Sequence, residues 1–269
     1  MITYILIALI SHMFCDFIFQ NKKIAEGRFP EGGLTNKNKY KLFKANAIHS
    51  FIHIVGIYLG LVLVNFFADL SLNYRLFSII VIGILHFIID SIKSIFTLLN
   101  NSIRSNIWIF IIDQLLHYIC IIIVFASGNW SSIPDKIFLG ASTFPSYFSS
   151  HNIVLIVILV ILISTYGTAY FSRTLLNSLG SNSNDNSIQG ATNGGFIIGI
   201  LERLFIMLGI IIKQPAIIVF VLTLKSIARY NKFKEDNFVE YFIIGTFLSL
   251  IVGILGGLII SRIVSFSIS

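Results

Sequence analysis

Charged residues are scarce in this chain, and their scarcity excludes an ordinary soluble domain. Asp, Glu, Lys and Arg make up 12% of its 269 residues, whereas soluble domains carry about 25%. Hydrophobic residues make up 56% of the chain, and its mean hydropathy is +0.88. Long apolar runs separated by short polar loops are typical of a multispanning membrane protein. We therefore predict an all-α fold, a polytopic membrane bundle of about eight transmembrane helices.

Cysteine is nearly absent, and so are the common nucleotide and serine-hydrolase motifs. The two cysteines, Cys15 and Cys120, both lie in apolar segments and imply no disulfide framework. The sequence has no P-loop, no G-x-G-x-x-G after a strand and no G-x-S-x-G nucleophile elbow. It therefore offers no support for nucleotide binding or for serine-based catalysis.

Eight apolar segments are candidates for membrane spans, with boundaries defined to within a few residues. They run approximately over 2–20, 45–68, 74–99, 107–126, 152–179, 195–212, 214–231 and 238–264. The first lacks a basic leader and an A-x-A-like cleavage site, so we expect a retained helix rather than a signal peptide. The predicted organisation is a four-helix half at 1–126, an extracytoplasmic loop at 127–151 and a second four-helix half at 152–269.

Basic residues predict the orientation of these spans. The loop at 21–44 holds Lys22, Lys23, Arg28, Lys37, Lys39, Lys41 and Lys44, whereas the loops on the other side hold few Lys or Arg. The positive-inside rule places this loop in the cytoplasm and both termini outside. Topology and contact with anionic lipid headgroups account for these charges, so no nucleic-acid partner is expected. The loop is also a candidate docking site for a cytoplasmic protein partner.

His and Asp residues recur as pairs within the first four predicted spans. Each pair is spaced i, i+4, which places both side chains on one face of a helix. The pairs are His12 and Asp16, His49 and His53, His86 and Asp90, and Asp113 and His117. Counted from the cytoplasmic end of each span, all eight residues lie in one layer, roughly 6–20 Å below that boundary. Four pairs at one depth predict a shared site.

The chemistry of these side chains favours a metal. Neutral imidazole and carboxylate groups are ligands for Zn²⁺, Mn²⁺ or Fe²⁺. A bare Asp in hydrocarbon is costly unless a cation or an ion-pair partner compensates its charge. One such pair is better explained by a hydrogen bond that holds the bundle together, but four pairs at one depth favour a metal. We predict that all eight residues serve one or two divalent ions, with zinc as first choice and manganese or iron as alternatives.

Eight residues exceed the four ligands of one tetrahedral site. Either some of them support the ligands and accept a proton, or two metals are bound. We predict catalytic roles for Asp16, Asp90 and Lys93. Lys93 follows Asp90 by three residues, so its ammonium has three candidate positions: against a phosphate, against Asp90, or extended to the cytoplasmic interface.

The second half of the chain carries fewer polar residues in its predicted spans. Glu202 and Lys225 fall at a similar depth, which predicts an ion pair. Arg203, Lys225 and Arg229 are alternatively candidates to hold an anionic headgroup. Two G-x-x-x-G pairs predict close helix packing, Gly195 with Gly199 and Gly253 with Gly257.

Several segments resemble a known family. "SHMFCDFIFQ", "HSFIHI", "LHFIIDSIK" and "FIIDQLLHY" are similar to the signature segments of an uncharacterised bacterial membrane family, a domain of unknown function often associated with SatD-like proteins. The resemblance continues in "GFIIGILERLF", "LKSIARY" and "EYFIIGTFLS". The pattern is also similar to that of predicted membrane-bound metal-dependent hydrolases. The resemblance implies a multi-pass protein of the bacterial plasma (inner) membrane and singles out the same eight His and Asp positions, without supplying a reaction.

These observations lead to one functional hypothesis with alternatives. The first is a membrane-embedded metal-dependent hydrolase that acts on a lipid-like ester or phosphoester near the cytoplasmic leaflet. The alternative is a transporter or channel that passes metal ions or protons through the same residues. A third is a non-catalytic membrane component that docks a partner at 21–44. The first four predicted spans contain no proline and few glycines, which favours a rigid site over a moving one.

Overall fold

The computed structural model describes residues 1–33, 35–68, 76–100, 106–126, 149–178, 194–234 and 236–268. Within these ranges every regular element is helical and there is no strand. The chain divides into two compact units, Met1–Ile156 and Val157–Ser269. The predicted extracytoplasmic loop at 127–151 lies outside the described residues up to residue 148. The fold is the all-α bundle that the hydropathy predicts.

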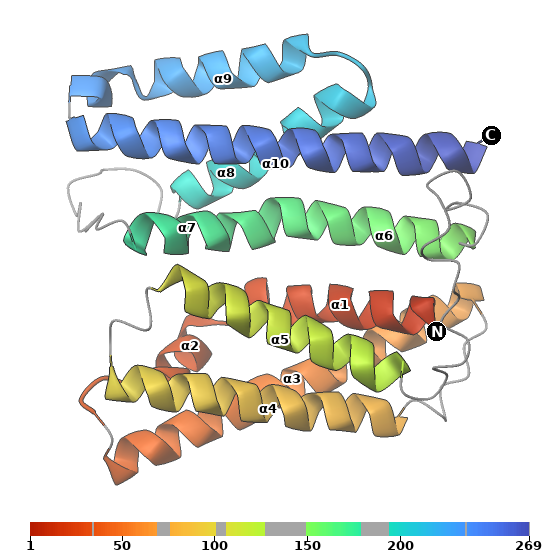
Figure 1. Cartoon of the computed structure of the whole chain (residues 1–269), viewed down its shortest axis with the longest axis vertical. Helices are drawn as coiled ribbons and strands as arrows, with labels where there is room; N and C mark the ends of the chain where they lie inside the picture. The colour runs from red at the N-terminus through yellow and green to blue at the C-terminus, as the bar shows by residue number, and fades with distance from the viewer. Residues whose placement is uncertain are drawn as a thin grey trace. The chain divides into compact units, whose positions relative to one another are not determined.

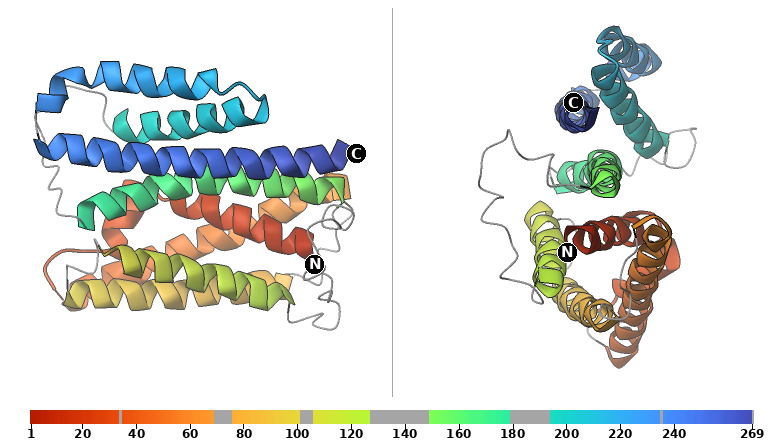
Figure 2. Two further views of the ribbon diagram at one scale, coloured as in Figure 1. Left: turned by 45° about the horizontal axis from the view of Figure 1, so that its top comes forward. Right: turned by 90° about the vertical axis from the view of Figure 1, so that its right-hand side faces the viewer.

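The first unit contains the helices that carry the His and Asp pairs. Its elements are α1 (Ile2–Phe17), α2 (Lys22–Arg28), α3 (Asn36–Ala68), α4 (Leu76–Leu99), α5 (Ile107–Ala126) and the first turns of α6 (Ser150–Leu162) (Figure 1). Seen end-on in the right panel of Figure 2, α1, α3, α4 and α5 stand around a common axis. Neighbours in sequence also pack together, α3 on α4 and α4 on α5, while α1 contacts both α3 and α5. Four helices thus face one interior.

The chain reverses sharply after α1. Asn21 caps α2, with its side chain accepting a hydrogen bond of 2.9 Å from the Ile24 amide, and the axes of α1 and α2 differ by 89°. Gly32 and Gly33 then adopt φ angles of +96° and +75°, a backbone region that glycine enters at little cost. The short helix α2 packs against α3. Part of the predicted cytoplasmic loop is therefore folded onto the bundle.

Small residues let α1 and α3 approach closely. A Cβ atom added at Gly60 would lie 2.8 Å from Ser11 Oγ, and one added at Gly56 would lie 2.7 Å from Cys15 Sγ. The Ser11 hydroxyl donates a hydrogen bond of 3.2 Å to the Gly56 carbonyl. Close approach through small residues is a common way to pack helices in membranes. It brings the His and Asp faces of α1 and α3 together.

The second unit contains the remainder of α6 and the later helices. Its elements are η5 (Ile163–Gly167, a π-helical turn), α7 (Thr168–Ser178), α8 (Gly194–Ile211), α9 (Ala216–Ala228), η6 (Tyr230–Lys234) and α10 (Asp236–Ile268). Helix α8 packs against both α9 and α10.

Only one of the two G-x-x-x-G pairs in this unit marks a helix contact. Cβ atoms added at Gly253 and Gly257 would lie 2.7 and 2.8 Å from Ile206 and Ile210 on α8. The same prediction is wrong for the other pair. Among the described residues, no atom lies within 4 Å of such a Cβ at Gly195, and at Gly199 it meets only Arg203 of the same helix.

Six helices of the described part are long and apolar enough to cross a membrane, and the bent pair α1–α2 brings the number to seven if it counts as one span. Each of the eight predicted spans contains an apolar helix, but α9 has only 13 residues. At 1.5 Å per residue it is about 20 Å long, shorter than the ~30 Å hydrocarbon core. Phe66, Phe77 and Trp108 are among many large apolar side chains that face outward, as lipid contact requires.

Candidate metal centre

The four His and Asp pairs converge inside the first unit. Helices α1, α3, α4 and α5 each contribute one pair, and the i, i+4 spacing turns both members of each pair toward the interior. The five histidines and two of the three aspartates are buried, and the Asp16 side chain is 11% exposed. The shared site predicted from spacing and depth is therefore present as a cluster, which we call the His/Asp cluster.

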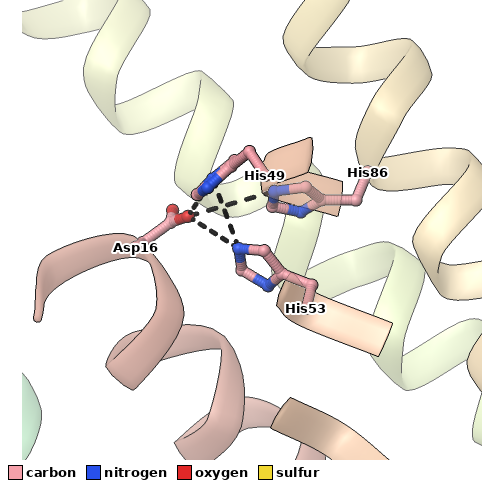
Figure 3. Close-up of side chains that lie close together, drawn as sticks. All are labelled: Asp16, His49, His53 and His86. Carbon is pink, nitrogen blue, oxygen red and sulfur yellow. Dashed lines mark hydrogen bonds and ion pairs between the residues drawn. The ribbon is translucent and has the colours of Figure 1, made fainter. Parts of the chain in front are cut away.

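Asp16 is at the centre of one group of four residues. Its Oδ1 atom lies 3.0 Å from His49 Nε2, 3.1 Å from His53 Nε2 and 3.9 Å from His86 Nε2. The two α3 histidines are 3.3 Å apart through their Nε2 atoms. Figure 3 shows the three imidazole rings directed at the carboxylate. A tetrahedral ion with bonds of about 2.0–2.1 Å holds its ligand atoms about 3.3 Å apart, so these spacings suit such an ion.

A second group of three residues adjoins the first and shares His86 with it. His86 Nε2 lies 3.2 Å from Asp90 Oδ2, and His117 Nε2 lies 3.8 Å from Asp90 Oδ1. Within each group the ligand-type atoms all lie within 4.8 Å of one another. Two neighbouring groups with a common histidine are compatible with one metal ion or with two.

His12 lies between the groups without belonging to either. Its ring centroid is 5.1 Å from that of His53, 5.4 Å from that of His86 and 5.2 Å from that of His117. Its Nε2 atom is 3.5 Å from Asp16 Oδ2. Both of its ring nitrogens are buried without a hydrogen-bond partner in the described part. His12 therefore lies beside both groups with its two ring nitrogens unpaired in the described part.

Asp113 and Lys93 form an ion pair beside the cluster. Lys93 Nζ donates to Asp113 Oδ2 over 2.7 Å, so in the described part its ammonium pairs with Asp113 and not with Asp90. The Asp113 backbone carbonyl accepts a bond of 2.7 Å from His117 Nδ1. With its proton on Nδ1, His117 leaves Nε2 as the atom available to a metal. Asp113 thus orients and neutralises its neighbours and is in neither group of possible ligands.

Two further side chains hold Asp16 in place. Gln114 Nε2 donates to Asp16 Oδ2 over 3.1 Å, and the Tyr118 hydroxyl donates to Gln114 Oε1 over 3.2 Å. Bonds of this kind fix the orientation of a carboxylate that binds metal. Asp16 Oδ1 is left facing the histidines.

Arg28 belongs to the cluster although sequence reasoning placed it among the loop cations that set topology. It is 5% exposed, and its Nη2 atom is 2.5 Å from Asp90 Oδ1. Its Nε donates to Asn46 Oδ1 over 3.0 Å. The 89° reversal and α2 carry it back into the bundle. Three features of the sequence could have indicated that Arg28 returns to the bundle. They are the capping Asn21, the Gly-Gly turn and the excess of aspartate over lysine in the first four predicted spans.

Seven buried atoms of the cluster have no hydrogen-bond partner within the described residues. They are His12 Nδ1 and Nε2, His49 Nδ1, His86 Nε2, Asp90 Oδ2, Asp113 Oδ1 and His117 Nε2. An unsatisfied buried polar atom costs about 1–3 kcal/mol, so most folded proteins contain few of them. Three of these atoms, His86 Nε2, Asp90 Oδ2 and His117 Nε2, belong to the residues of the second group of possible ligands. The donor set and its unpaired atoms therefore fit a bound divalent cation.

The fold and the site define a class: an all-α polytopic helix bundle with a buried His/Asp cluster that is able to hold a metal ion. The chain belongs to a family described as "Protein of unknown function (DUF3307)", whose model matches residues 4–139. That match spans all four His and Asp pairs and Arg28. No curated protein and no solved structure matches the chain.

Proposed function

We propose that the protein is a membrane-embedded hydrolase that depends on a divalent metal ion. The observation that carries this proposal is the convergence of Asp16, His49, His53 and His86 on one point, with their ligand-type atoms all within 4.8 Å of one another. Imidazole and carboxylate ligands suit zinc first, with manganese or iron as alternatives. We place the protein in the bacterial plasma (inner) membrane.

The residues of the cluster divide into roles under this proposal. The four-residue group around Asp16 holds the ion, and His86, Asp90 and His117 hold a second ion or assist the first. A bound metal supplies a Lewis acid and lowers the pKa of a water molecule to near neutrality. Asp90 would be available as a proton acceptor if it does not itself hold an ion, because its Oδ2 has no hydrogen-bond partner in the described part while Arg28 holds its Oδ1.

The proposed substrate follows from the surroundings of the cluster. The site lies within a bundle whose outer surface is apolar, and the lysine-rich loop supports an orientation with the site toward the cytoplasmic leaflet. A lipid-like ester or phosphoester presents a polar bond at that depth with its chains in the hydrocarbon. We predicted a catalytic role for Lys93. Under this proposal Lys93 instead neutralises the charge of Asp113, whose Oδ2 lies 2.7 Å from Lys93 Nζ. The loop at 21–44, in which Lys37, Lys39 and Lys41 are exposed, remains the proposed docking site for a cytoplasmic protein partner.

Transport of a metal ion or proton is the second candidate. The observation that favours it is the shared His86, which links two adjacent groups of ligands and would let an ion move from one to the other. A flux assay separates the two candidates. Protein reconstituted in vesicles that contain a zinc-sensitive dye should show no metal-dependent flux above that of empty vesicles if the protein is a hydrolase.

The test of the metal proposal is elemental analysis of protein purified without chelator. We expect about one or two equivalents of a transition metal in the wild type, and a melting temperature that falls with chelator and recovers with Zn²⁺ or Mn²⁺. His53→Ala should lose most of the metal. His151→Ala is the matched control, because this sixth histidine is on α6 and outside both groups.

Two outcomes would contradict the proposal. A wild type without transition metal, whose melting temperature ignores both chelator and added metal, removes the metal and the hydrolase with it. A metal-loaded protein that leaves ester and phosphoester lipids intact, while His53→Ala abolishes zinc flux in vesicles, replaces hydrolysis by transport.

A further inference from the structure

The second unit has a cavity that the metal proposal does not use. Its volume is about 490 Å³, and its walls come from α7, α8, α9 and α10, the last three being drawn side by side in Figures 1 and 2. A volume in this range is typical of small-molecule sites. Its wall combines basic side chains with aromatic ones, among them Phe196 and Phe242.

The charges of the lining residues do not balance. Four of them are cations and one is an anion, namely Arg173, Arg203, Lys225, Arg229 and Glu202. Lys225 donates to both carboxylate oxygens of Glu202, over 2.9 and 2.7 Å. The sequence predicts this ion pair, and its two charges cancel. Among the described residues the three arginines form no ion pair with a carboxylate, and the lining has a net positive charge that favours an anion.

Arg203 is the deepest of the three. It is 2% exposed, and its two terminal nitrogens donate to neutral acceptors, Ser249 Oγ over 3.1 Å and the Thr165 carbonyl over 2.9 Å. Thr165 belongs to the π-helical turn η5, a feature often found at functional sites. Arg203 Nε is buried without a hydrogen-bond partner in the described part. A buried guanidinium whose hydrogen bonds go only to neutral acceptors is costly, and a bound anion would offset that cost.

Arg173 and Arg229 complete the cationic wall. Arg173 is on α7 and Arg229 follows the last turn of α9, and neither side chain forms an ion pair among the residues with defined positions. Planar guanidinium groups bind phosphate oxygens in bidentate fashion. A phosphate group carries between one and two negative charges. It therefore compensates the positive charge of three arginines more fully than a single carboxylate would. The aromatic walls suit an apolar chain.

We propose that this cavity binds a phosphate-bearing anion, with the phosphate against the three arginines and any apolar chain against Phe196 and Phe242. Two sources supply this chemistry, the headgroup of an anionic phospholipid and free phosphate. Basic pockets between membrane helices on the cytoplasmic side are known sites for anionic headgroups. The site uses none of the residues of the His/Asp cluster, so it is independent of the proposed metal.

The test compares two double variants of the full chain. Arg173→Gln with Arg229→Gln removes two charges from the cavity at positions that are exposed and half-buried. Lys213→Gln with Lys234→Gln removes two charges outside it. Binding is measured by native mass spectrometry with phosphatidylglycerol, with phosphatidylcholine and with inorganic phosphate. The cavity variant should bind phosphatidylglycerol roughly 25-fold more weakly than wild type, from about five-fold for each charge, and the control should bind like wild type.

The outcomes of this test distinguish the two possible ligands from each other and from a failure of the proposal. Binding of phosphatidylglycerol that inorganic phosphate does not displace identifies the lipid headgroup, and displacement by phosphate identifies the free anion, both in support of the site. Equal losses in the two double variants would reduce the effect to general surface attraction. That result, or a wild type that binds neither phosphatidylglycerol above phosphatidylcholine nor phosphate, overturns the proposal. The circular dichroism spectrum of each variant confirms that it is folded.

Discussion

Arg28 and Asp90 form a deeply buried ion pair at the His/Asp cluster. Their side chains are 6% and 1% exposed, and Asn46 accepts a further bond from the guanidinium. A buried pair of this kind contributes little compared with a well-packed apolar pair, but the loss of one partner leaves the other charge uncompensated. The pair also connects the short helix α2 to the site on α4.

We expect Arg28→Met to destabilise the protein by about 3–5 kcal/mol, because it leaves Asp90 charged and buried. Adding Asp90→Asn should restore part of that loss. Unfolding is measured with chelator present, so that any metal bound near Asp90 does not contribute. Lys22→Met is the control, since the Lys22–Glu26 pair is 90% and 56% exposed and such pairs are worth less than about 1 kcal/mol. A double variant less stable than Arg28→Met would show that the two residues do not compensate each other.

At the scale of single elements, the contact between α1 and α3 decides whether the two His and Asp faces meet. Gly56 and Gly60 on α3 lie against Cys15 and Ser11 of α1, on the turns next to Asp16 and His12. Side chains at these positions would push the helices apart, and the ligands with them. The sequence pattern did not draw attention to this glycine pair, although its spacing equals that of the pairs in the second unit.

Gly60→Ala should therefore lower the free energy of unfolding by roughly 1–3 kcal/mol, the usual cost of overpacking. The added Cβ would lie 2.8 Å from Ser11 Oγ and 2.9 Å from Ile7 Cγ2. Gly245→Ala is the control, because a Cβ there meets nothing within 4 Å and alanine favours the helix by up to about 1 kcal/mol. Equal melting temperatures for the two variants would mean that α1 and α3 do not pack closely.

The Glu202–Lys225 pair links α8 to α9 in the same way that Arg28 links α2 to α4. Glu202 is 2% exposed at its side chain and Lys225 is 18% exposed. Glu202→Gln should destabilise the protein more than Glu202→Gln combined with Lys225→Met, because only the single change leaves an unpaired charge. The thermal unfolding of both variants measures this difference. Strictly additive losses would argue against the pair.

At the scale of the whole molecule, the orientation in the membrane rests on the lysine-rich loop. The prediction has both termini outside and the 21–44 loop in the cytoplasm, which requires an even number of spans. Six helices qualify by length and composition, and α1–α2 adds a seventh. Helix α9, with 13 residues, then decides whether the number is eight. The side of the membrane on which the C-terminus lies therefore stays a prediction.

Cysteine labelling from each side of the membrane tests this orientation. Single cysteines at Lys39 and Ser269, in a background with Cys15 and Cys120 replaced by alanine, should react with an impermeant reagent from opposite sides. Labelling of both positions from the same side would mean that α9 does not span, or that the first helix enters the other way. The common depth of the His and Asp pairs would then need another explanation.

The sequence alone determined the class of fold and the eight His and Asp residues of the cluster. Hydropathy over 18 or more residues identifies a spanning helix, because the bilayer leaves no other way to satisfy its backbone. The i, i+4 spacing puts two side chains on one face by helix geometry alone. Both are local rules, and for that reason all four predicted pairs reach one site.

Only the tertiary structure decided which residues contact one another within that site. Lys93 has two buried carboxylates near its helix and pairs with Asp113, because α5 places that carboxylate 2.7 Å away. Arg28 reaches Asp90 because α1 ends in an 89° reversal, and its charge alone looked like any other in a basic loop. The division of the cluster into two groups that share His86 is likewise set by distances between helices. Such distances depend on how helices pack, for example at Gly56 and Gly60, and packing is a property of pairs of elements that no single segment encodes.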